Sequence, residues 1–333
     1  MQSLAIKYRP STWDGVCEQS SIKAILTNQL REHETKNAYL FCGPAGCGKT
    51  TCARIFANNL NQGKGNPIEL DAASHNGVDD VREINNQART QSLDSEYKVF
   101  IIDECHSLSN NACQAMLKLI EEPPAKAVFI FCTTDPQKIP RTILSRVQRY
   151  DFQRISLRGI YDRLLSVMQV EGYNVTEDTE QALMYIAKQS FGGMRDALTA
   201  LDKCLALTSN LTVQTVVEAL GVVDYNVLYD FWFAYVVGDT KKLLEIVSTA
   251  YYGGKDLKQF VKSAVQFFID VCKYDLTKDW LLIGLPQTKL LEDCEPYDFE
   301  QAKKLLEVFM RLNAEIKYSA NPLYDVEGAI LLL

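Results

Sequence analysis

Short apolar segments that alternate with helical patterns in the first half of the sequence constrain the fold most. Five segments have the β-branched and aromatic residues of strands, and the first four are nearly all apolar. Strands that helices cover on both faces need such sequences, because neither face meets water. The alternation therefore predicts an α/β domain with a parallel sheet. The expected strands are AYLFC (Ala38–Cys42), IELDA (Ile68–Ala72), KVFIID (Lys98–Asp103), AVFIFC (Ala127–Cys132) and RYDF (Arg149–Phe152), and the expected helices between them are Thr50–Asn61, Val78–Gln91 and Asn110–Glu121.

The strand patterns end at Phe152, and the remainder of the sequence is helical. Apolar residues recur there every three or four positions, which is the spacing of an amphipathic helix. We interpret the two richest apolar stripes, which begin at Leu257 and Ala302, as helix core. Three helices are expected directly after the last strand, at Leu157–Glu171, Thr179–Gln189 and Met194–Thr208. The predicted domains are an α/β domain over residues 1–154, a small helical domain over residues 155–209 and an all-α domain over residues 210–333.

Composition narrows the class of protein. The 333 residues are 47% hydrophobic and 23% charged, which is ordinary for a globular chain. The net charge of −7 is uneven, because residues 1–154 carry 18 Lys/Arg and 17 Asp/Glu whereas the remainder carries 17 and 25. A near-neutral first part is compatible with a local DNA-facing surface. No apolar run approaches the roughly 20 residues of a membrane span, and the first residues do not form a signal peptide. We therefore expect a cytoplasmic protein with no membrane partner.

Ten cysteines are spread along the sequence, and none forms a Cys-x-x-Cys pair, the strongest short zinc signal. Several lie inside apolar runs, among them Cys42 and Cys132, where a free thiol behaves as a small apolar group. We therefore expect reduced, buried thiols rather than a disulfide framework.

The segment GPAGCGKT, residues 43–50, follows an expected strand, opens an expected helix and fits the pattern G-x-x-x-x-G-K-[ST]. Its glycines let the loop curl so that backbone N–H groups face a phosphate, and the helix N-terminus adds partial positive charge. We expect Lys49 to reach the β- and γ-phosphates and Thr50 to hold Mg²⁺. The pattern arises by chance in roughly one such chain in a hundred, so a merely flexible loop is a poor alternative.

Two acids end the apolar segment VFIIDECH, residues 99–106. Asp103 is expected to bind Mg²⁺, directly or through water, and Glu104 to act on the attacking water as general base. An isolated Asp-Glu pair at a strand end is usually a solvated loop start. The phosphate-binding pattern upstream favours a catalytic pair here.

In their order along the chain, these motifs and several further segments resemble the ATPase subunit of a bacterial or phage replicative clamp loader, the gamma/tau subunit of DNA polymerase III, within the AAA+ class. The resemblance covers most of the chain and implies a P-loop domain, a helical lid and an all-α oligomerising collar over the three predicted domains. The segments that carry it, besides the phosphate loop, are KYRPSTW (Lys7–Trp13), ELDAASHNGVDDVREI (Glu69–Ile84), IIDECHSLSNNACQAMLKLIEEPP (Ile101–Pro124), CTTDPQKIPRTILSR (Cys132–Arg146) and GGMRDAL (Gly192–Leu198).

The resemblance also implies a role for individual residues. The hydroxyl of Thr134, with Thr133 as the alternative, is expected to contact the attacking water or the γ-phosphate. Arg195 is expected to contact the phosphates from the lid of the same subunit, and Arg146 to enter the neighbour's site as an arginine finger. Lys118 matches a lysine that faces DNA. The implied catalytic set is Glu104, Lys49, Thr134 and Arg146, and the implied nucleotide-binding set is Tyr8, Arg9, Pro10, Gly43, Pro44, Ala45, Gly46, Cys47, Gly48, Lys49, Thr50, Thr51, Asp103 and Arg195, with Thr50 and Asp103 on Mg²⁺.

The chain departs from the family pattern at three places. The family's four zinc-binding cysteines are missing from the interval Asn58–Glu69, so we predict that no zinc is bound. Val147 replaces the cysteine of the family's Ser-Arg-Cys segment, a small apolar change that leaves the neighbouring arginine usable. The residues His75–Gly77 stand where the family has a basic pair that helps to grip DNA.

The function that the resemblance implies is that of an ATP-driven motor subunit. With other clamp-loader subunits in a pentamer, such a subunit opens a sliding clamp and loads it onto primer–template DNA at the replisome. Two alternatives stay open. One is an inactive stator subunit of the same complex, which would typically have a degraded phosphate loop. The other is a branch-migration helicase, which would need a C-terminal winged-helix domain with a β-hairpin.

Overall fold

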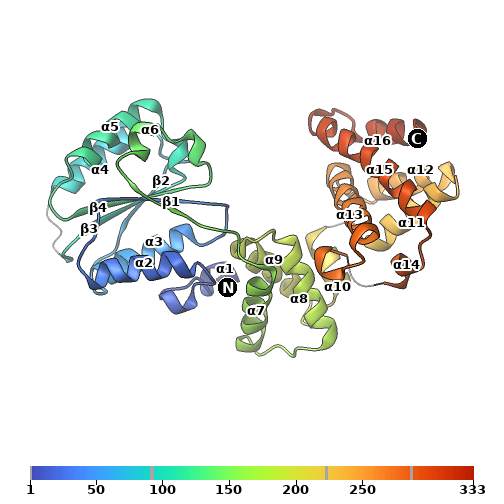
Figure 1. Ribbon diagram of the computed structural model, residues 1–333, viewed down its shortest axis with the longest axis horizontal. Helices are drawn as coiled ribbons and strands as arrows, with labels where there is room; N and C mark the ends of the chain where they lie inside the picture. Colours follow the sequence, from blue (N-terminus) through green and yellow to red (C-terminus); the bar gives the residue numbers. More distant parts are fainter. Residues whose placement is uncertain (1, 91–93, 222–223, 286–287) are drawn as a thin grey trace. The chain divides into compact units, whose positions relative to one another are not determined.

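The computed structural model describes residues 2–90, 94–221, 224–285 and 288–333 (Figure 1). The chain forms two compact units, residues 1–202 and 203–333. The boundary between the units lies within α9 (Met194–Leu207), a few residues before the predicted start of the all-α domain at residue 210. The predicted boundary at residue 154 falls inside the first unit and stays a prediction.

A five-stranded parallel sheet forms the centre of the first unit, in the order β2-β3-β4-β1-β5. It confirms the predicted α/β class. Register pairs Cys42 with Thr133 and Asp71 with Asp103, so the carboxyl ends of these strands meet at one edge of the sheet. Ligands of open α/β sheets bind at this edge. The strands are β1 (Ala38–Cys42), β2 (Ile68–Asp71), β3 (Lys98–Asp103), β4 (Ala127–Thr133) and β5 (Gln148–Asp151).

Helices cover both faces of the sheet (Figure 1). Alternate residues of β1 belong to opposite cores: Leu40 packs in the core on the side of α4 and α5, and Phe41 in the core on the side of α2 and α3. Both cores are apolar, which explains why the central strands have no polar face. The covering helices are α2 (Ser20–Arg31) and α3 (Lys49–Leu60) on one face, and α4 (Val78–Arg89), α5 (Asn110–Glu121) and α6 (Arg141–Leu144) on the other.

The second strand differs from the sequence prediction. Along β2 half-buried and exposed residues alternate, and Glu69 and Asp71 are exposed. The strand lies at the edge of the sheet, with one neighbour, so it is not covered on both faces as the apolar-segment argument implied. The predicted end of the following helix, Gln91, lies outside the described residues.

Three helices complete the first unit after β5: α7 (Leu157–Val170), α8 (Glu177–Gln189) and α9. Ser156 and Thr176 cap the first two, because the hydroxyl of each accepts a hydrogen bond from the backbone N–H three residues on. The short elements of this unit are α1 (Leu4–Lys7), η1 (Trp13–Gly15), η2 (Cys105–Ser107) and η3 (Pro136–Lys138).

The second unit is helical throughout its described residues. Its core joins α11, α12, α13, α15 and α16, and includes the fully buried side chains of Trp232, Phe260 and Phe309. Most residues of the two apolar stripes lie in this core, which confirms their interpretation as core. The helices are α10 (Val213–Leu220), α11 (Tyr225–Val236), α12 (Thr240–Tyr252), α13 (Leu257–Thr277), η4 (Trp280–Leu282), α14 (Lys289–Glu292), α15 (Pro296–Glu315), η5 (Ile316–Tyr318) and α16 (Pro322–Leu331).

Candidate active site

The loop between β1 and α3 has a backbone that only glycine adopts without strain. Gly43, Gly46 and Gly48 have φ values of +150°, +71° and +103°. Gly43 also lacks room for a side chain, because a Cβ atom there would lie 2.5 Å from the carbonyl oxygen of Phe152. The loop curls around the buried side chain of Lys49, whose Nζ donates hydrogen bonds of 2.8 Å to the carbonyl oxygens of Gly43 and Pro44.

A hydroxyl and a carboxylate meet where α3 begins beside the end of β3. Thr50 Oγ1 donates a hydrogen bond of 2.7 Å to Asp103 Oδ2. Hydroxyl, carboxylate and phosphate oxygens are the hard ligands that Mg²⁺ prefers, and Mg²⁺ usually takes only one or two from the protein. The two residues therefore fit a magnesium site completed by phosphate and water.

Glu104, the residue after β3, has a left-handed backbone with φ +46°. Thr134 Oγ1 donates a hydrogen bond of 2.9 Å to Glu104 Oε2. Thr133, the last residue of β4, is fully buried, and its Oγ1 accepts a hydrogen bond of 3.0 Å from the backbone N–H of Asp135. The structure thus brings Thr134, rather than Thr133, to the acid.

The phosphate loop and the acids open into a cavity of about 460 Å³, a volume typical of small-molecule sites. The cavity also has walls that sequence motifs did not mark, among them Val16, Cys17, Ile155 and Arg163. Of the predicted nucleotide-binding and catalytic residues, those that line it are Tyr8, Arg9, Pro10, Ala45, Gly46, Cys47, Gly48, Lys49, Thr50, Thr51, Asp103, Glu104 and Arg195. Gly43 and Pro44 do not line the cavity, but their carbonyl oxygens accept the hydrogen bonds from Lys49 Nζ that hold the loop.

Positive charge gathers at the cavity. Arg9 donates a hydrogen bond of 3.2 Å from Nε to Thr51 Oγ1. Burial lowers the pKa of Arg9, and the neighbouring guanidinium groups of Arg54 and Arg195 lower it further. Cations held so close together favour an anionic ligand such as a polyphosphate.

The segment before α2 joins the cavity to α7. Tyr8 donates a hydrogen bond of 2.6 Å from its hydroxyl to Glu171 Oε1, which also accepts one of 2.5 Å from Lys7 Nζ. Arg163 Nη2 donates a hydrogen bond of 3.0 Å to the backbone oxygen of Tyr8. Burial raises the pKa of the Tyr8 phenol, and its bond to Glu171 raises it further. No local motif identifies Arg163 or Glu171 as part of the site, because each residue contacts a partner more than 150 positions away in sequence.

The lid helix α9 contacts the phosphate loop directly. Met194 N–H donates a hydrogen bond of 3.0 Å to the carbonyl oxygen of Gly46. The contact is close enough that a Cβ atom on Gly46 would lie 3.0 Å from the Cα atom of Gly193. The first turn of α9 therefore starts on the loop and carries Arg195 to the cavity.

Besides Gly43 and Pro44, three predicted residues do not line the cavity: Thr134, which reaches it only through its bond to Glu104, Arg146 and Lys118. Arg146 forms an ion pair of 2.8 Å with Glu121 Oε1 and donates a hydrogen bond of 2.9 Å to the Thr142 carbonyl oxygen, with 41% of its side chain exposed. Lys118 is exposed on α5, one turn before Glu121. Neither residue lines the cavity of its own subunit.

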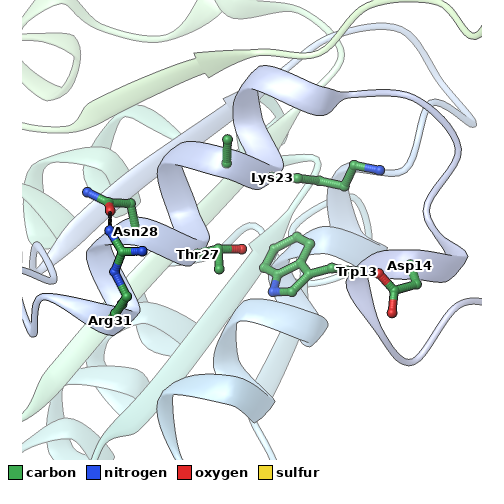
Figure 2. Close-up of a pocket in the computed structure, with 7 residues that line it drawn as sticks. Trp13, Asp14, Lys23, Thr27, Asn28 and Arg31 are labelled. Carbon is green, nitrogen blue, oxygen red and sulfur yellow. Dashed lines mark hydrogen bonds between the residues drawn. The ribbon is translucent and has the colours of Figure 1, made fainter.

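A second, more open cavity of about 320 Å³ lies against the outer face of α2 (Figure 2). Trp13 lines it together with Asp14, Lys23 and Arg31, and none of the predicted site residues takes part. The end of the KYRPSTW segment therefore contacts this second cavity, whereas Tyr8, Arg9 and Pro10 line the first.

Over the residues that the structure describes, no three His, Cys, Asp or Glu side chains are grouped so that they could hold a metal ion. The absence of zinc stays a prediction. In the described part of the chain, every helix is too short or too polar to cross a membrane.

Comparisons with known proteins identify relatives of the chain. A family model described as "DNA polymerase III, delta subunit" matches residues 66–156, which include Asp103, Glu104, Thr134 and Arg146. DNA polymerase III subunit tau of Bacillus subtilis is 33% identical over 99% of this chain and 62% of its own length. DNA polymerase III subunit gamma/tau of Mycobacterium tuberculosis is 35% identical over 80% of this chain and 50% of its own length.

Solved structures show the fold. The Thermotoga maritima RuvB Holliday junction branch migration motor aligns with a TM-score of 0.54 and 18% identity, over 69% of this chain and 79% of that one. The T. maritima RuvB A156S mutant aligns with a TM-score of 0.55. These likenesses show that the chain shares the fold of these RuvB structures.

The sequence relationship is more specific. The chain spans about half to three fifths of the length of the two relatives named above, and nearly all of its own length is matched by the first. The matched length includes the phosphate loop, the acids and the lid. Over nearly all of its length the chain is therefore similar to DNA polymerase III tau and gamma/tau subunits.

Proposed function

We propose that this protein is the ATP-driven motor subunit of a clamp loader, which opens a sliding clamp and loads it onto primer–template DNA. One observation carries the proposal. In a single cavity, the phosphate loop with Lys49 meets the Thr50–Asp103 pair, the acid Glu104 and the lid arginine Arg195. These are the groups that ATP hydrolysis needs, at the edge of the sheet where ligands bind.

Each group has a chemical task. Lys49 exchanges its carbonyl partners for the β- and γ-phosphates, while the loop N–H groups and the start of α3 bind further phosphate oxygens. Thr50 and Asp103 hold Mg²⁺, which supplies charge neutralisation on the phosphates when it is bound. Glu104, tied to Thr134, orients and deprotonates the attacking water. Tyr8, Arg9 and Pro10 enclose the far end of the nucleotide, and Arg195 contacts its phosphates from the lid.

Arg146 is proposed to act on the neighbouring subunit. Its partner Glu121 is 47% exposed, and exposed ion pairs contribute only about 0–1 kcal/mol. An arginine finger contributes on the order of 10³–10⁵ in rate, or about 4–7 kcal/mol. Release of Arg146 from Glu121 therefore costs little against what the finger supplies.

Assembly and partners follow from the same proposal. The described part of residues 203–333 is an all-α unit, suited to packing side by side with other clamp-loader subunits in a pentamer. Lys118 would contact the DNA backbone rather than its sequence. We place the protein in the cytoplasm, at the replisome.

The two alternative functions fit less well. A stator subunit needs no working phosphate loop, but here the loop glycines, Lys49 and the Thr50–Asp103 pair are complete. A branch-migration helicase would need a winged-helix domain with a β-hairpin after the lid. Across the described parts of residues 203–333 every regular element is helical.

The first test is ATP binding and turnover with Lys49→Ala. The variant removes the cation that faces the phosphates, so we expect loss of ATP binding by at least about 100-fold in filter-binding assays. Lys64→Ala, which changes an exposed lysine in the loop after α3, is the control and should bind as the parent does. Unchanged binding by Lys49→Ala would contradict the proposed site.

The second test concerns the finger. In the assembled complex with primed DNA, Arg146→Ala should leave ATP binding unchanged and lower stimulated turnover by about 10³-fold. Arg149→Ala removes another exposed arginine, which pairs with Asp151, and should keep full turnover. Full stimulated turnover by Arg146→Ala would contradict the proposed action of Arg146 on the neighbouring subunit.

A third test concerns DNA. Lys118→Ala should weaken binding of primed DNA for all sequences alike, and should lower the slope of log affinity against log salt by about 1. Lys126→Ala is the control, because this lysine pairs with Glu96. Identical salt slopes for Lys118→Ala and the parent would show that Lys118 does not contact the backbone.

A further inference from the structure

His106 lies three residues after Asp103, and neither composition nor motif spacing marked it as part of the site. Its Nδ1 lies 3.1 Å from Thr133 Oγ1 and 3.3 Å from Glu104 Oε2. The side chain is 18% exposed. One ring nitrogen thus lies between the buried hydroxyl at the end of β4 and the acid that follows β3.

The chemistry of these partners determines where the ring proton lies. A carboxylate only accepts hydrogen bonds, so a bare nitrogen lone pair at 3.3 Å from Glu104 Oε2 would be repelled. Thr133 Oγ1 already accepts the backbone N–H of Asp135 and keeps a second lone pair. Nδ1 therefore carries a hydrogen that both oxygens can share.

We propose that His106, as its Nδ1–H tautomer, is a positioning residue that ties Glu104 to the end of β4. Thr134 Oγ1 donates to the same carboxylate oxygen, Oε2. Among the described residues no donor contacts Glu104 Oε1, so this oxygen is the one left to accept a proton from water. The inference rests on the proposed function, because it deepens the role of Glu104 as base.

The need for such a tie follows from the backbone. Glu104 is no longer held by the sheet, since β3 ends at Asp103, and its φ of +46° places it in a tight turn before η2. A carboxylate on such a turn has free rotation about its side-chain bonds unless neighbours hold it. Removal of a side chain that orients a functional group typically lowers activity about 10–100-fold.

The kinetic test compares His106→Leu with His106→Asn. Leucine removes the donor at similar size, whereas the asparagine Nδ2 can donate from nearly the position of Nδ1. We expect His106→Leu to lower kcat about 10–100-fold with ATP affinity within about 2-fold of the parent, and His106→Asn to recover most of the loss. Parental kcat in His106→Leu, or no recovery in His106→Asn, would overturn the proposal.

A double variant separates positioning of Glu104 from a general structural effect. In the Glu104→Gln background the base is already removed, so His106→Leu should lower kcat by less than about 2-fold more. A further loss as large as in the parent background would show that His106 acts elsewhere and overturn the inference.

Nitrogen-15 NMR identifies the tautomer of His106 and does not depend on ATP turnover. The sequence has three histidines, so the His106 signal is assigned as the one that His106→Leu removes. We expect a protonated Nδ1, and a bare Nδ1 would overturn the proposal. Absence of ATPase activity in the parent would instead contradict the proposed function. In that case a protonated Nδ1 would still support the contact to Glu104 by itself.

Discussion

At the start of the phosphate loop, Gly43 combines a φ of +150° with close contact to the backbone of Phe152. A side chain at this position would be strained and would also collide with a carbonyl oxygen that cannot rotate away. Glycine is needed here for two reasons, whereas Gly172 has a φ of +79° and open space around it.

This difference can be measured. We expect Gly43→Ala to lower the free energy of unfolding by about 2–4 kcal/mol, because backbone strain and steric overlap add. Gly172→Ala should cost only about 1 kcal/mol, since strain acts alone. Urea unfolding monitored by circular dichroism gives both values. Equal losses in the two variants would mean that the contact with Phe152 relaxes.

The contact that a single hydroxyl makes also depends on where its residue lies relative to the end of a strand. Thr133 and Thr134 are neighbours of the same type, and either could have met the acid. Thr133, the last residue of β4, is buried beside His106, whereas Thr134 follows the strand and its hydroxyl reaches Glu104. The point at which β4 ends therefore selects Thr134.

Among the elements, α7 has a cap that comes from a distant segment. The carboxylate of Glu18 accepts hydrogen bonds of 3.2 and 3.1 Å from the backbone N–H of Ser156. Gln19 exchanges hydrogen bonds of 2.7 and 3.2 Å with the backbone of Gln153. The two residues before α2 thereby fasten the connection between β5 and the lid, and both adopt left-handed φ values, 54° and 51°.

Removal of this cap should destabilise the first unit. Glu18→Ala leaves the Ser156 N–H without its carboxylate, so we expect the free energy of unfolding to fall by about 1 kcal/mol. Glu177→Ala is the matched control, because this acid lies in the first turn of α8 and contributes a few tenths of a kcal/mol. Urea midpoints measure both. Equal losses of stability in the two variants would show that Glu18 acts only through its negative charge and not as a hydrogen-bond acceptor for Ser156.

At the scale of the whole molecule, the cysteines share one property. All ten are free and seven are buried, which confirms the expectation of buried thiols. Burial raises the pKa of Cys42 to about 11 and that of Cys52 to about 12, and it raises the pKa of Cys132 well above its ordinary value. The folded protein therefore keeps these thiols neutral.

Stability should then decline in alkali. Unfolded thiols release their protons near pH 8.5, whereas Cys42 and Cys52 keep theirs up to about pH 11 and 12, so between these values the unfolded state binds fewer protons. Stability is thus fully present below about pH 8.5 and falls by up to about 1.4 kcal/mol per pH unit for each such thiol.

Urea unfolding at pH 8, 9 and 10 measures this decline. Cys52→Ala removes one buried thiol, so its stability should fall less steeply with pH than that of the parent. The slope, rather than the absolute stability, is the readout, because the substitution also leaves a small cavity. Parallel slopes would contradict the assignment of the decline to buried thiols.

The elements with a strong local pattern were predictable from the sequence. The predicted bounds of β1, β3 and α5 agree with the structure, and β4 is one residue longer than expected. The edge strand β2 was misjudged, since an apolar count says nothing about which strand lies at the border of a sheet. The chemistry of the phosphate loop was also local, because its glycines, lysine and threonine lie within eight residues.

By itself, then, the sequence determined the helical and extended segments, the loop that faces phosphate and the two acids that follow β3, because short-range spacing encodes each of them. Only the tertiary structure decided that Thr134 contacts Glu104, that Met194 contacts Gly46 and that Arg146 rests on Glu121. These contacts join residues 25 to about 150 positions apart. Chain folding brings them together through packing of the whole sheet and lid, and no local pattern records that packing.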